Sequence, residues 1–444
     1  MSLKESVLYR AIGRSMLARY SVYAANFASM MILARLFTPD TFGIVATIAV
    51  FYVFFQLMAE AGLAPAIINV TSLSRRDRNG LFALTTLVGL VLSIIFYLCT
   101  PLFVAFYGVS EVAGVTPYVA GTLLFSAASI VPNAALLRDQ KFFFIAIGGF
   151  SSIVISTMLV VLLAEYIDSL HALSSKVFWA SIVNFVLLYV LSARTGIGRP
   201  SWGGKLSAIK PLLSFSGYQF GFNFINYFSR NLDNILVGKY VGTQALGVYE
   251  KAYQLMRYPL MLLTFAMTPA IQPVVRRYAD QPAKVEAVHR AFVFKLSLVG
   301  ALAGVVLYFL AEWVVFFALG DQWERVIPII RILSLAIPVQ VVMSSIGSFF
   351  QAMNRPELLF RTGLISAFII VIAIAIGVYA RDLLFLSWAL VIAFHLSFVQ
   401  SYYFLYTRVF RVSPARLAWV LAPAGAVIVA LASYSFGLWQ VFFL

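Results

Sequence analysis

The chain contains an internal repeat whose period is about half its length. Gly43-Ile44 returns as Gly247-Val248, and Pro65-Ala66-Ile67 returns as Pro269-Ala270-Ile271. Both pairs have the same offset in the numbering, so the block between them aligns without a gap. Solenoid repeats have periods of roughly 20–50 residues, so this repeat indicates a duplicated domain. In a membrane chain, such a duplication predicts two helix bundles with a substrate site on the axis between them.

The composition is that of a membrane protein. Hydrophobic residues make up 62% of the 444 positions and charged residues only 11%, whereas soluble domains have about 25% charged residues. The mean hydropathy is +0.93. Since one helical crossing takes about 20 apolar residues, we predict an all-α polytopic membrane protein with thirteen crossings, or fourteen if a further helix follows the last residue. The expected crossings are 15–37, 42–70, 80–106, 116–137, 142–164, 177–194, 212–237, 246–275, 290–318, 326–350, 362–380, 385–407 and 418–444.

Lys and Arg residues gather in every second loop. If the N-terminus is cytoplasmic, the inner segments hold about 21 of them and the outer segments about 5. This asymmetry predicts a multi-pass protein with its N-terminus in the cytoplasm. It also accounts for the net charge of +15, which indicates contact with anionic membrane lipids and no nucleic-acid partner.

The longest inner connection, rich in Gly, Pro and Lys, divides the chain near its middle. It predicts an N-terminal six-helix bundle at 1–194, a cytoplasmic linker at 195–211, a C-terminal six-helix bundle at 212–409 and an additional transmembrane helix at 410–444. Each half then holds an even number of helices, so the repeats are parallel and related by an axis along the membrane normal. A later echo joins RDQK at 138–141 to MNRP at 353–356, with a drifted offset.

Polar side chains follow one face of the seventh expected crossing. They step by 4, 3, 4 and 3 residues, the spacing of a helical stripe: Gln219, Asn223, Asn226, Arg230 and Asp233. A charge at a helix centre costs about 2.5–3.5 kcal/mol, so such residues usually face a wet cavity or a partner. We interpret the stripe as the lining of a lumen. The alternative is that Arg230 and Asp233 pair with each other and the amides join helices.

The eighth crossing has a second stripe, with steps of 4, 3, 4, 3 and 4 residues: Glu250, Gln254, Arg257, Met261, Thr264 and Thr268. Lys251 lies beside it. The same two interpretations apply, a lumen lining or a structural pairing of charges. Glu250 and Asp233 are the acidic candidates for such pairs or for binding a coupling ion.

The first half has milder equivalents. Asn26 aligns with Arg230 at the repeat offset, and Gln56 and Glu60 share one face of the second crossing. Glu60 is either a proton or cation site that couples transport to a gradient, or a fixed counter-charge to Arg19. In the tenth crossing, we expect the lone Arg331 to have a structural or snorkelling role and not to contact a ligand.

Sequence motifs of catalysis are absent. There is no P-loop, metal-ligand cluster or nucleophile motif, so we expect a protein that is not an enzyme and needs neither cofactor nor metal. The single Cys99 excludes an internal disulfide. The outer loops reach about a dozen residues at most, which leaves little room for an enzyme of polymer assembly.

Several segments resemble motifs of a known family. Residues 33–43 (LARLFTPDTFG) resemble the ARLLGPEEFG signature of bacterial polysaccharide flippases, and residues 60–63 (EAGL) resemble their acidic-x-Gly-Leu segment. Residues 230–238 (RNLDNILVG) followed by 246–249 (LGVY) are similar to a longer block of the same family. Residues 320–323 (GDQW) resemble another short element of that family. The chain thus resembles the oligosaccharide flippase branch of the multidrug/oligosaccharidyl-lipid/polysaccharide exporter superfamily. Within that branch it looks most like exporters of exopolysaccharide or colanic-acid-type units.

This resemblance implies two six-helix bundles around a V-shaped central cavity, with extra C-terminal helices in some members of the family. The additional helix expected at 410–444 fits such a member. It implies a flippase that moves an undecaprenyl-pyrophosphate-linked oligosaccharide repeat unit from the cytoplasmic to the periplasmic leaflet of the bacterial inner membrane, for exopolysaccharide or lipopolysaccharide assembly. The implied mechanism is alternating access. Polymerase and export machinery are further expected partners, and we expect the carrier itself to be a monomer.

The polar stripes fit such a substrate. Arg230, Arg257 and Lys251 would hold the pyrophosphate or acidic sugars, with the guanidinium groups supplying forked donors. The amides would bind sugar hydroxyls: Gln219, Asn223, Asn226, Gln254 and, in the first half, Asn26.

Three alternatives stay open. A flippase for lipid II-type peptidoglycan precursors would need a similar charge pattern. A cation-coupled multidrug exporter of the same superfamily would favour acidic residues in the cavity, whereas here basic residues outnumber them. A membrane enzyme of polymer assembly is disfavoured by the short outer loops.

Overall fold

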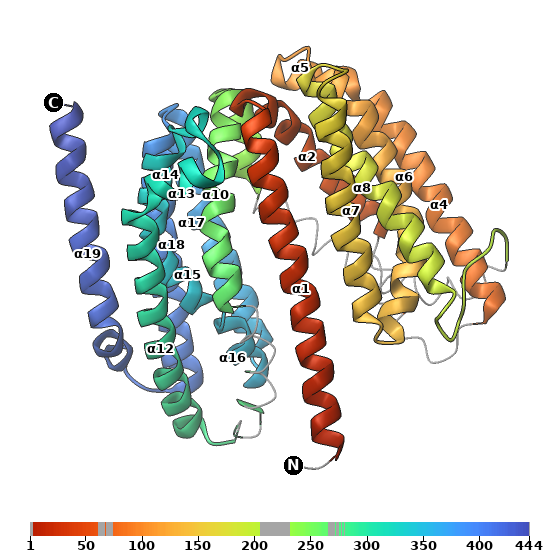
Figure 1. Cartoon of the computed structure of the whole chain (residues 1–444). Coiled ribbons are helices and arrows are strands. Elements are labelled where there is room, and N and C mark those ends of the chain that lie inside the picture. Colours follow the sequence, from red (N-terminus) through yellow and green to blue (C-terminus); the bar gives the residue numbers. More distant parts are fainter. Residues whose placement is uncertain are drawn as a thin grey trace. The chain divides into compact units, whose positions relative to one another are not determined.

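The computed structural model describes residues 3–60, 67, 74–204, 231–264, 271, 275–276, 278 and 280–443, with side chains from residue 20 onward except 420 and 436–443. The described residues form helices and no strand (Figure 1). Up to residue 204 the helices are α1 Leu3–Leu36, α2 Pro39–Glu60, α4 Arg75–Leu98, α5 Thr100–Tyr107, α6 Val112–Arg138, α7 Phe142–Leu163 and α8 Ser169–Ser192. From residue 231 on they are α10 Thr243–Thr264, α12 Pro282–Phe309, α13 Ala311–Ala318, η1 Asp321–Trp323, α14 Val326–Ser334, α15 Ile337–Met343, α16 Ile346–Ala352, α17 Pro356–Tyr379, α18 Leu383–Phe404, η2 Leu405–Phe410 and α19 Ala415–Phe443.

Internal contacts group the chain into two compact units, Met1–Gly247 and Val248–Leu444. The boundary falls inside α10, whose first residues belong to the first unit. The expected linker at 195–211 is described only as far as residue 204, so the predicted domain boundaries stay a prediction.

Eight of the described helices are long and apolar enough to cross a membrane. The segment made of α14 to α16 adds a ninth span if its two parts, which meet at a bend of 53°, are counted together. The expectation of an all-α polytopic membrane protein is therefore confirmed. The expected crossings at 15–37, 246–275 and 418–444 coincide largely with α1, α10 and α19, and the one at 212–237 lies mostly outside the described residues.

Two expected crossings differ from the structure. The tenth, expected as one helix at 326–350, is broken into α14, α15 and α16. The third, expected at 80–106, consists of α4 and the short α5, which are separated at Cys99, just before Pro101 at the start of α5. In both places a proline stands at the first or second position of the following helix, where its missing N–H costs least.

The duplication runs through the order of the helices. The helices α2 and α10 start at 39 and 243, which is the offset of the repeated glycines, and both are 22 residues long. The offset is slightly larger for α5 and α13, which start at 100 and 311 and are both 8 residues long. From α6 onward the offset grows once more and then stays constant. The helices α6, α7 and α8 start at 112, 142 and 169, and their counterparts α14–α16, α17 and α18 start at 326, 356 and 383. Short insertions in the second half thus account for the drift of the offset.

The helix ends after α6 and α16 repeat in atomic detail. Gln140 and Asn354 have φ angles of 56° and 55°. The amide of the next residue, Lys141 or Arg355, donates to the carbonyl five residues earlier at 2.9 Å in both cases, as in a Schellman helix end. The segments 138–141 and 353–356, joined in the sequence, both contain this helix end. The structure pairs Gln140 with Asn354, however, one position off the in-order alignment, which sets Gln140 opposite Arg355.

The N-termini of α8 and α18 repeat as well. Asp168 and Asp382 occupy equivalent positions, and each accepts the backbone amides two and three residues further along the chain. These carboxylates satisfy N–H groups that have no partner within the helix.

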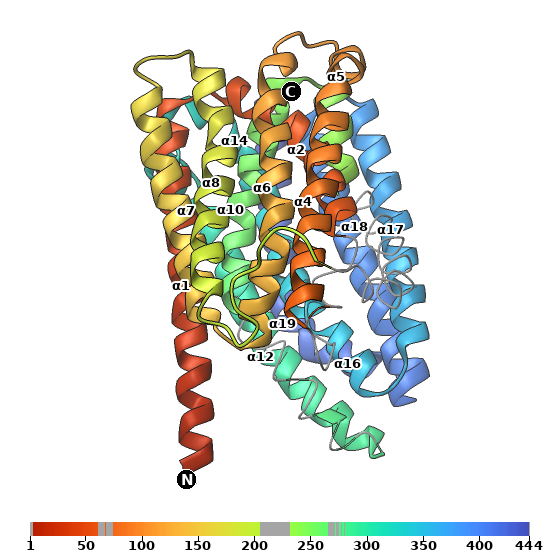
Figure 2. The ribbon, with the colours of Figure 1, turned by 90° about the vertical axis from the view of Figure 1, so that its right-hand side faces the viewer.

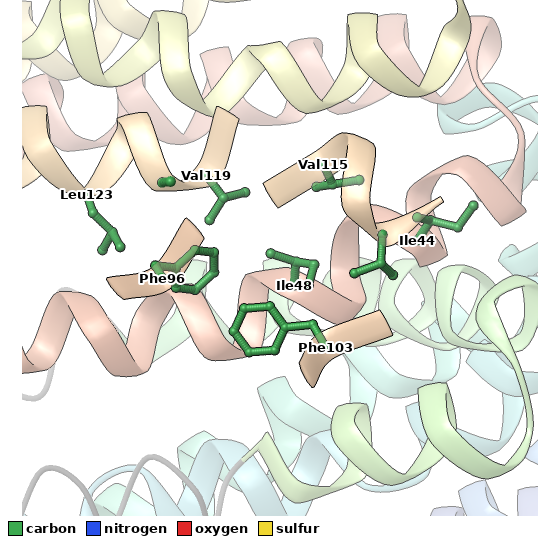
Figure 3. Close-up of a cluster of buried hydrophobic side chains, with 9 residues drawn as sticks. Ile44, Ile48, Phe96, Phe103, Val115, Val119 and Leu123 are labelled. Atoms are coloured by element: carbon green, nitrogen blue, oxygen red, sulfur yellow. The ribbon is translucent and has the colours of Figure 1, made fainter. Parts of the chain in front are cut away.

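In the first unit, α6 is the central helix. It packs against α2, α4 and α8, and Figure 2 shows α4, α6, α8 and α7 side by side. Where α2 and α6 begin, an apolar cluster joins them to α4 and α5 (Figure 3): Ile44, Ile48, Phe96, Phe103, Val115, Val119 and Leu123. This cluster fixes the first half of α2 against its neighbours.

Candidate functional site

In the second unit, α10 carries a chain of hydrogen-bonded polar groups that starts at a buried lysine. Lys251 is only 5% exposed, and its amine donates to the side-chain oxygen of Gln254 at 3.2 Å. Gln254 in turn hydrogen-bonds with Tyr258. The three residues lie three and four positions apart, on one side of the helix. Lys251 therefore orients Gln254, and the ammonium group stays within the unit instead of extending to the surface.

Arg257 lies on the face of α10 that the second unit leaves exposed. Its guanidinium carbon is 5.4 Å from the centre of the Tyr253 ring, a cation–π contact that holds the group without neutralising it. Glu250, one residue before Lys251 and electrostatically coupled to it, is half-buried. In the described part of α10, the guanidinium group of the stripe is thus exposed and the other stripe residues are half-buried. Thr268 lies outside the described residues, and the role of the stripe as the lining of a lumen stays a prediction.

In the first unit, α2 carries the corresponding polar side chains. Gln56 donates to the Glu60 carboxylate at 3.1 Å, one turn further along the helix. Both are half-buried. One turn before Gln56, the hydroxyl of Tyr52 is hydrogen-bonded to Ser126 of α6 at 3.0 Å. The first unit therefore has a polar strip of three consecutive turns on α2, which ends at a carboxylate.

The second unit places a polar contact at the equivalent position. Met256 of α10 is the repeat equivalent of Tyr52, and Gln340 of α15 is the repeat equivalent of Ser126. The Gln340 amide approaches the Met256 sulfur at 3.9 Å, so it makes only a weak hydrogen bond. The sequence analysis missed Tyr52, Ser126 and Gln340. The repeat offsets would have aligned Tyr52 with Met256 and Ser126 with Gln340.

The other predicted site residues either make only local contacts or lie outside the described part of the chain. Asn26 of α1 is exposed, and its amide donates to the Val22 carbonyl at 3.1 Å. Asp233 is 7% exposed and accepts the Asn234 amide at 2.9 Å. Arg19 belongs to α1, but its side chain is not described. Four residues of the seventh crossing lie outside the described residues: Gln219, Asn223, Asn226 and Arg230.

Two further charged groups have structural partners. Arg331 of α14 pairs with Glu312 of α13 at 3.6 Å, which agrees with the structural role expected for it. His289 of α12, which sequence reasoning passed over, is fully buried among aromatic rings, and its Nδ1 is 3.1 Å from the Tyr406 hydroxyl. Within the described part of the chain, no cluster of three or more His, Cys, Asp or Glu residues could hold a metal ion.

Comparison with known proteins links the chain to polysaccharide assembly. Residues 32–328 match the family of polysaccharide biosynthesis proteins. Three relatives are similar over much of their length. The chain is 23% identical over 389 residues to the lipopolysaccharide biosynthesis protein WzxC of Escherichia coli, covering 85% of this chain and 76% of that protein. It is 22% identical over 371 residues to the succinoglycan biosynthesis transport protein ExoT of Rhizobium meliloti, covering 83% and 74%. It is 22% identical over 322 residues to the teichuronic acid biosynthesis protein TuaB of Bacillus subtilis, where the match covers 69% of this chain and spans only 63% of the relative.

Solved structures share the fold at much lower identity. The lipid II flippase MurJ in an inward closed conformation superimposes with a TM-score of 0.71 at 12% identity, over 94% of this chain and 92% of the other. An inward-facing multidrug transporter of the MATE family gives 0.66 at 13% identity, over 91% and 94%. The architecture is therefore that of membrane flippases and exporters.

Proposed function

Because the chain belongs to the family of polysaccharide biosynthesis proteins and is a multi-pass membrane protein, we propose that it is a flippase for a lipid-linked oligosaccharide. It moves an undecaprenyl-pyrophosphate-linked repeat unit from the cytoplasmic to the periplasmic leaflet of the bacterial inner membrane by alternating access. Its N-terminus is cytoplasmic. The product supplies exopolysaccharide or lipopolysaccharide assembly, whose polymerase and export machinery act next.

The combination of the relatives with the fold carries the proposal. The relatives described above are named for the biosynthesis or transport of polysaccharides, while the fold is that of proteins that move molecules across membranes. A transporter in a polysaccharide pathway has to move either the finished polymer or its lipid-linked unit. A carrier of this size fits the smaller, lipid-linked unit.

The chemistry of α10 fits an anionic and polyhydroxylated headgroup. Arg257 offers forked donors to a pyrophosphate oxygen pair, and Tyr253 keeps the guanidinium in place. Gln254, oriented by Lys251, offers its amide to sugar hydroxyls. A polar group of the headgroup that entered the bilayer without a hydrogen-bond partner would cost several kcal/mol. The side chains of α10 replace the water molecules that these groups lose.

The polar strip on α2 supplies the complementary function in the first unit. Glu60 at its end is a carboxylate within a membrane-spanning helix, held by Gln56. An intramembrane carboxylate can bind a proton or a cation, and we assign Glu60 this coupling role. Tyr52, Ser126 and Gln340 add hydroxyl and amide groups that can contact sugars.

The experiment is deletion and complementation in the organism that encodes the protein. We expect the deletion to abolish the surface polysaccharide and to cause lipid-linked repeat units to accumulate in the inner leaflet. Wild-type protein should restore export, whereas Arg257→Ala should lower it about tenfold or more, since hydrogen bonds to charged groups contribute about 1.5–3 kcal/mol. Arg257→Lys should restore part of it. A deletion strain with a normal amount of polysaccharide would contradict the proposal.

A matched control is Arg355→Ala. Arg355 is an arginine of the same unit that pairs with Glu357 at 2.5 Å, but it belongs to the connection between α16 and α17, and we expect normal export. Two further assays separate the related activities. Rescue of a strain depleted of its lipid II flippase would indicate a peptidoglycan precursor as substrate, and increased resistance to organic cations would indicate drug export.

A further inference from the structure

An acid and a base are buried one turn apart near the start of α12. Glu286 is 3% exposed, and His289 is completely buried. Residues three apart on a helix lie on the same face, with about 5–6 Å between their Cβ atoms. Buried polar groups are normally hydrogen-bonded, because an unpartnered polar atom in apolar surroundings is costly. The contacts of these two side chains therefore indicate what the site can bind.

Each of the two side chains has one buried polar atom without a hydrogen bond. Nδ1 of His289 is 3.1 Å from the Tyr406 hydroxyl, whereas its Nε2 makes no hydrogen bond to any described residue. Oε1 of Glu286 likewise accepts no hydrogen bond from the described part of the chain. The Nε atom of Arg290 lies 3.7 Å from it, which is an ion pair but too long for a hydrogen bond. The unsatisfied atoms thus belong to an acid and to a base.

Aromatic rings from three neighbouring segments enclose the imidazole of His289. The centres of four rings lie within 5.6 Å of its own: Phe349 of α16, Tyr402 of α18, and Tyr406 and Phe410 of η2. The segment η2 is a π-helix, a wide turn that occurs frequently at functional sites. The surroundings of the pair are therefore apolar and well packed.

The polar and charged side chains at the pair are two tyrosines and an arginine. Tyr402 donates its hydroxyl to the Val342 carbonyl at 3.0 Å, so it is already engaged. Tyr406 is electrostatically coupled to both Glu286 and Arg290. The Arg290 side chain is 39% exposed. Arg290 can therefore leave the carboxylate for water without disturbing the packing.

The first unit has different chemistry at the same place. At the offset that relates α5 to α13, Arg78 of α4 corresponds to His289. At the same offset, Arg75 corresponds to Glu286. Arg78 is also buried, and its guanidinium group donates to the carbonyl of Ile197. Because a guanidinium group keeps its charge and has no acceptor atom, the first unit has a permanent cation where the second unit has groups that can exchange a proton.

We propose that Glu286 and His289 form a proton-binding site in the second unit. In the unprotonated site, the Glu286 carboxylate is paired with Arg290. A proton that binds to the carboxylate gives it an O–H group, and Glu286 turns to donate this group to Nε2 of His289. His289 stays neutral, and its Nδ1–H group donates to the Tyr406 hydroxyl oxygen. One proton thus satisfies both unpartnered atoms and replaces a buried charge by a neutral acid, which apolar surroundings favour.

Proton binding changes two contacts beyond the pair. Arg290 loses its counter-charge, and its guanidinium group turns to water. The imidazole is held in the tautomer that has its hydrogen on Nδ1, since Nε2 accepts from the acid, so a directed hydrogen bond ties α12 to η2. The site goes beyond the proposed function, because it involves no contact with the transported molecule.

Infrared spectroscopy of the purified protein tests the site. As the pH is lowered in steps, the carbonyl band of a protonated carboxylic acid reports each carboxylate that takes up a proton. We expect a band that the wild type shows and Glu286→Gln lacks, at a pH at which the exposed carboxylates are still ionised. Glu357→Gln is the matched control and should keep this band, because Glu357 is an exposed glutamate of the same unit, paired with Arg355. If Glu286 takes up its proton only together with the exposed carboxylates, the proposal is overturned.

Two further variants test the partners of the carboxyl group. Arg290→Ala removes the cation that favours the carboxylate, so the band should appear at a higher pH than in the wild type. His289→Phe keeps a ring between the aromatic side chains but has no acceptor for the O–H group, so the band should appear at a lower pH. We expect shifts of about one pH unit, a tenfold change in proton affinity.

The outcome is decided on folded protein and without a transport assay. Size-exclusion chromatography selects the folded fraction of each variant, and Arg290→Ala changes a half-exposed side chain, so it remains a test even if His289→Phe does not fold. An unchanged band position in Arg290→Ala, or a shift to lower pH, would overturn the proposal. Loss of polysaccharide export would not replace either result, so the proton site and the flippase function are judged separately.

Discussion

The helix α6 and the segment α14–α16 occupy the same place in the two repeats and differ in one respect. Val112–Arg138 and Val326–Ala352 have the same length, and they start and end at equivalent positions of the repeat. The first is one continuous helix, whereas the second is broken and bent by 53°. The comparison shows what decides whether a duplicated membrane helix stays straight.

The number of prolines does not decide it. The continuous α6 contains Pro117 and Pro132 in its interior, and the broken segment contains Pro328 and Pro338. A proline inside a membrane helix is tolerated when its neighbours satisfy the freed backbone groups. Position 338 corresponds to Leu124 in α6, so the prolines differ in place and not in number.

The neighbouring helix makes a further difference. In the first unit, Ser93 of α4 donates its hydroxyl to the carbonyl of Ala120 in α6 at 2.6 Å. In the second unit, the equivalent residue of α12 is Gly304, whose Cβ position lies 2.9 Å from the carbonyl oxygen of Ser334. The side chain that secures α6 is therefore missing where its counterpart breaks.

Pro338 itself rests on the same side of α12. Its Cα lies 3.0 Å from the Cβ position of Gly300. The equivalent residue of α4 is also a glycine, Gly89, which lies against α6. In both units a glycine at this level thus lies against the neighbouring helix. The second unit differs by the proline that packs on this glycine and by the second glycine at 304.

The largest effect is expected from moving the break into α6. Leu124→Pro places in the first unit the residue that stands at 338 in the second. A proline in a helix interior costs about 3 kcal/mol or more, and α6 is the central helix of its unit, so we expect little folded protein. Size-exclusion chromatography of a fluorescent fusion would measure the yield.

The reciprocal change is the control for this substitution. Pro338→Leu gives the second unit the residue of the first and restores an N–H group, so the protein should fold with normal yield. Equal yields of the Leu124→Pro and Pro338→Leu proteins would show that neighbouring helices do not distinguish the two places.

An intermediate effect is expected from adding a side chain at Gly300, where α12 lies against Pro338. Gly300→Leu forces a side chain against the backbone of Pro338, and overpacking of this kind costs about 1–3 kcal/mol. Thermal unfolding in detergent, followed by fluorescence, would show a lower melting temperature. Gly363→Leu, at an open position of α17, should leave the melting temperature nearly unchanged. Similar losses in the two variants would show that the close contact of Gly300 with Pro338 does not matter for stability.

A smaller effect is expected from the hydroxyl that secures α6. Ser93→Ala removes the bond to the Ala120 carbonyl, and hydrogen bonds between membrane helices contribute on average about 0.6 kcal/mol and at most about 1.7 kcal/mol. The melting temperature should fall slightly. An unchanged value would mean that α6 does not depend on this contact.

The smallest effect concerns the repeated carboxylate caps. Partial burial raises the pKa of Asp168, but the hydrogen bonds from the backbone and ring of His171 and from the Leu170 amide outweigh it and hold that pKa below its ordinary value. A carboxylate whose pKa is lowered by folding stabilises the folded protein at pH values above its pKa in the unfolded chain, about 3.9. This contribution is lost as the pH falls through the pKa that the group has in the folded protein.

Asp168→Ala should therefore cost about 1 kcal/mol or less at neutral pH. The difference from the wild type should shrink as the pH falls below about 4. Melting temperatures at a series of pH values would measure both. A difference that persists undiminished in acid would show that charge plays no part in this cap.

Most of the fold could be predicted from the sequence because its signals are local. Long apolar runs and the alternation of Lys and Arg between loops give the crossings, and Gly43 and Gly247 give the duplication. The echo at residues 138–141 and 353–356 was visible because a helix end needs particular residues. Each of these signals depends on neighbours along the chain.

The break in α14–α16 could not be predicted, because it depends on Gly304 in another helix as well as on Pro338. The pair Tyr52–Ser126 was missed for a related reason. A tyrosine and a serine in an apolar helix look like packing residues until the partner helix is known. Of the predicted site, the α10 face with Arg257 is described, and its role in binding stays a prediction.

The central claim is that this protein carries a lipid-linked oligosaccharide across the membrane. Purified protein in liposomes that contain a fluorescent polyprenyl-pyrophosphate oligosaccharide tests it most directly, with a membrane-impermeant quencher that reports the outward-facing fraction. We predict that the protein moves substrate from the protected to the accessible leaflet, and that Arg257→Ala slows this movement about tenfold. Substrate that stays protected as it does in protein-free liposomes would contradict the account.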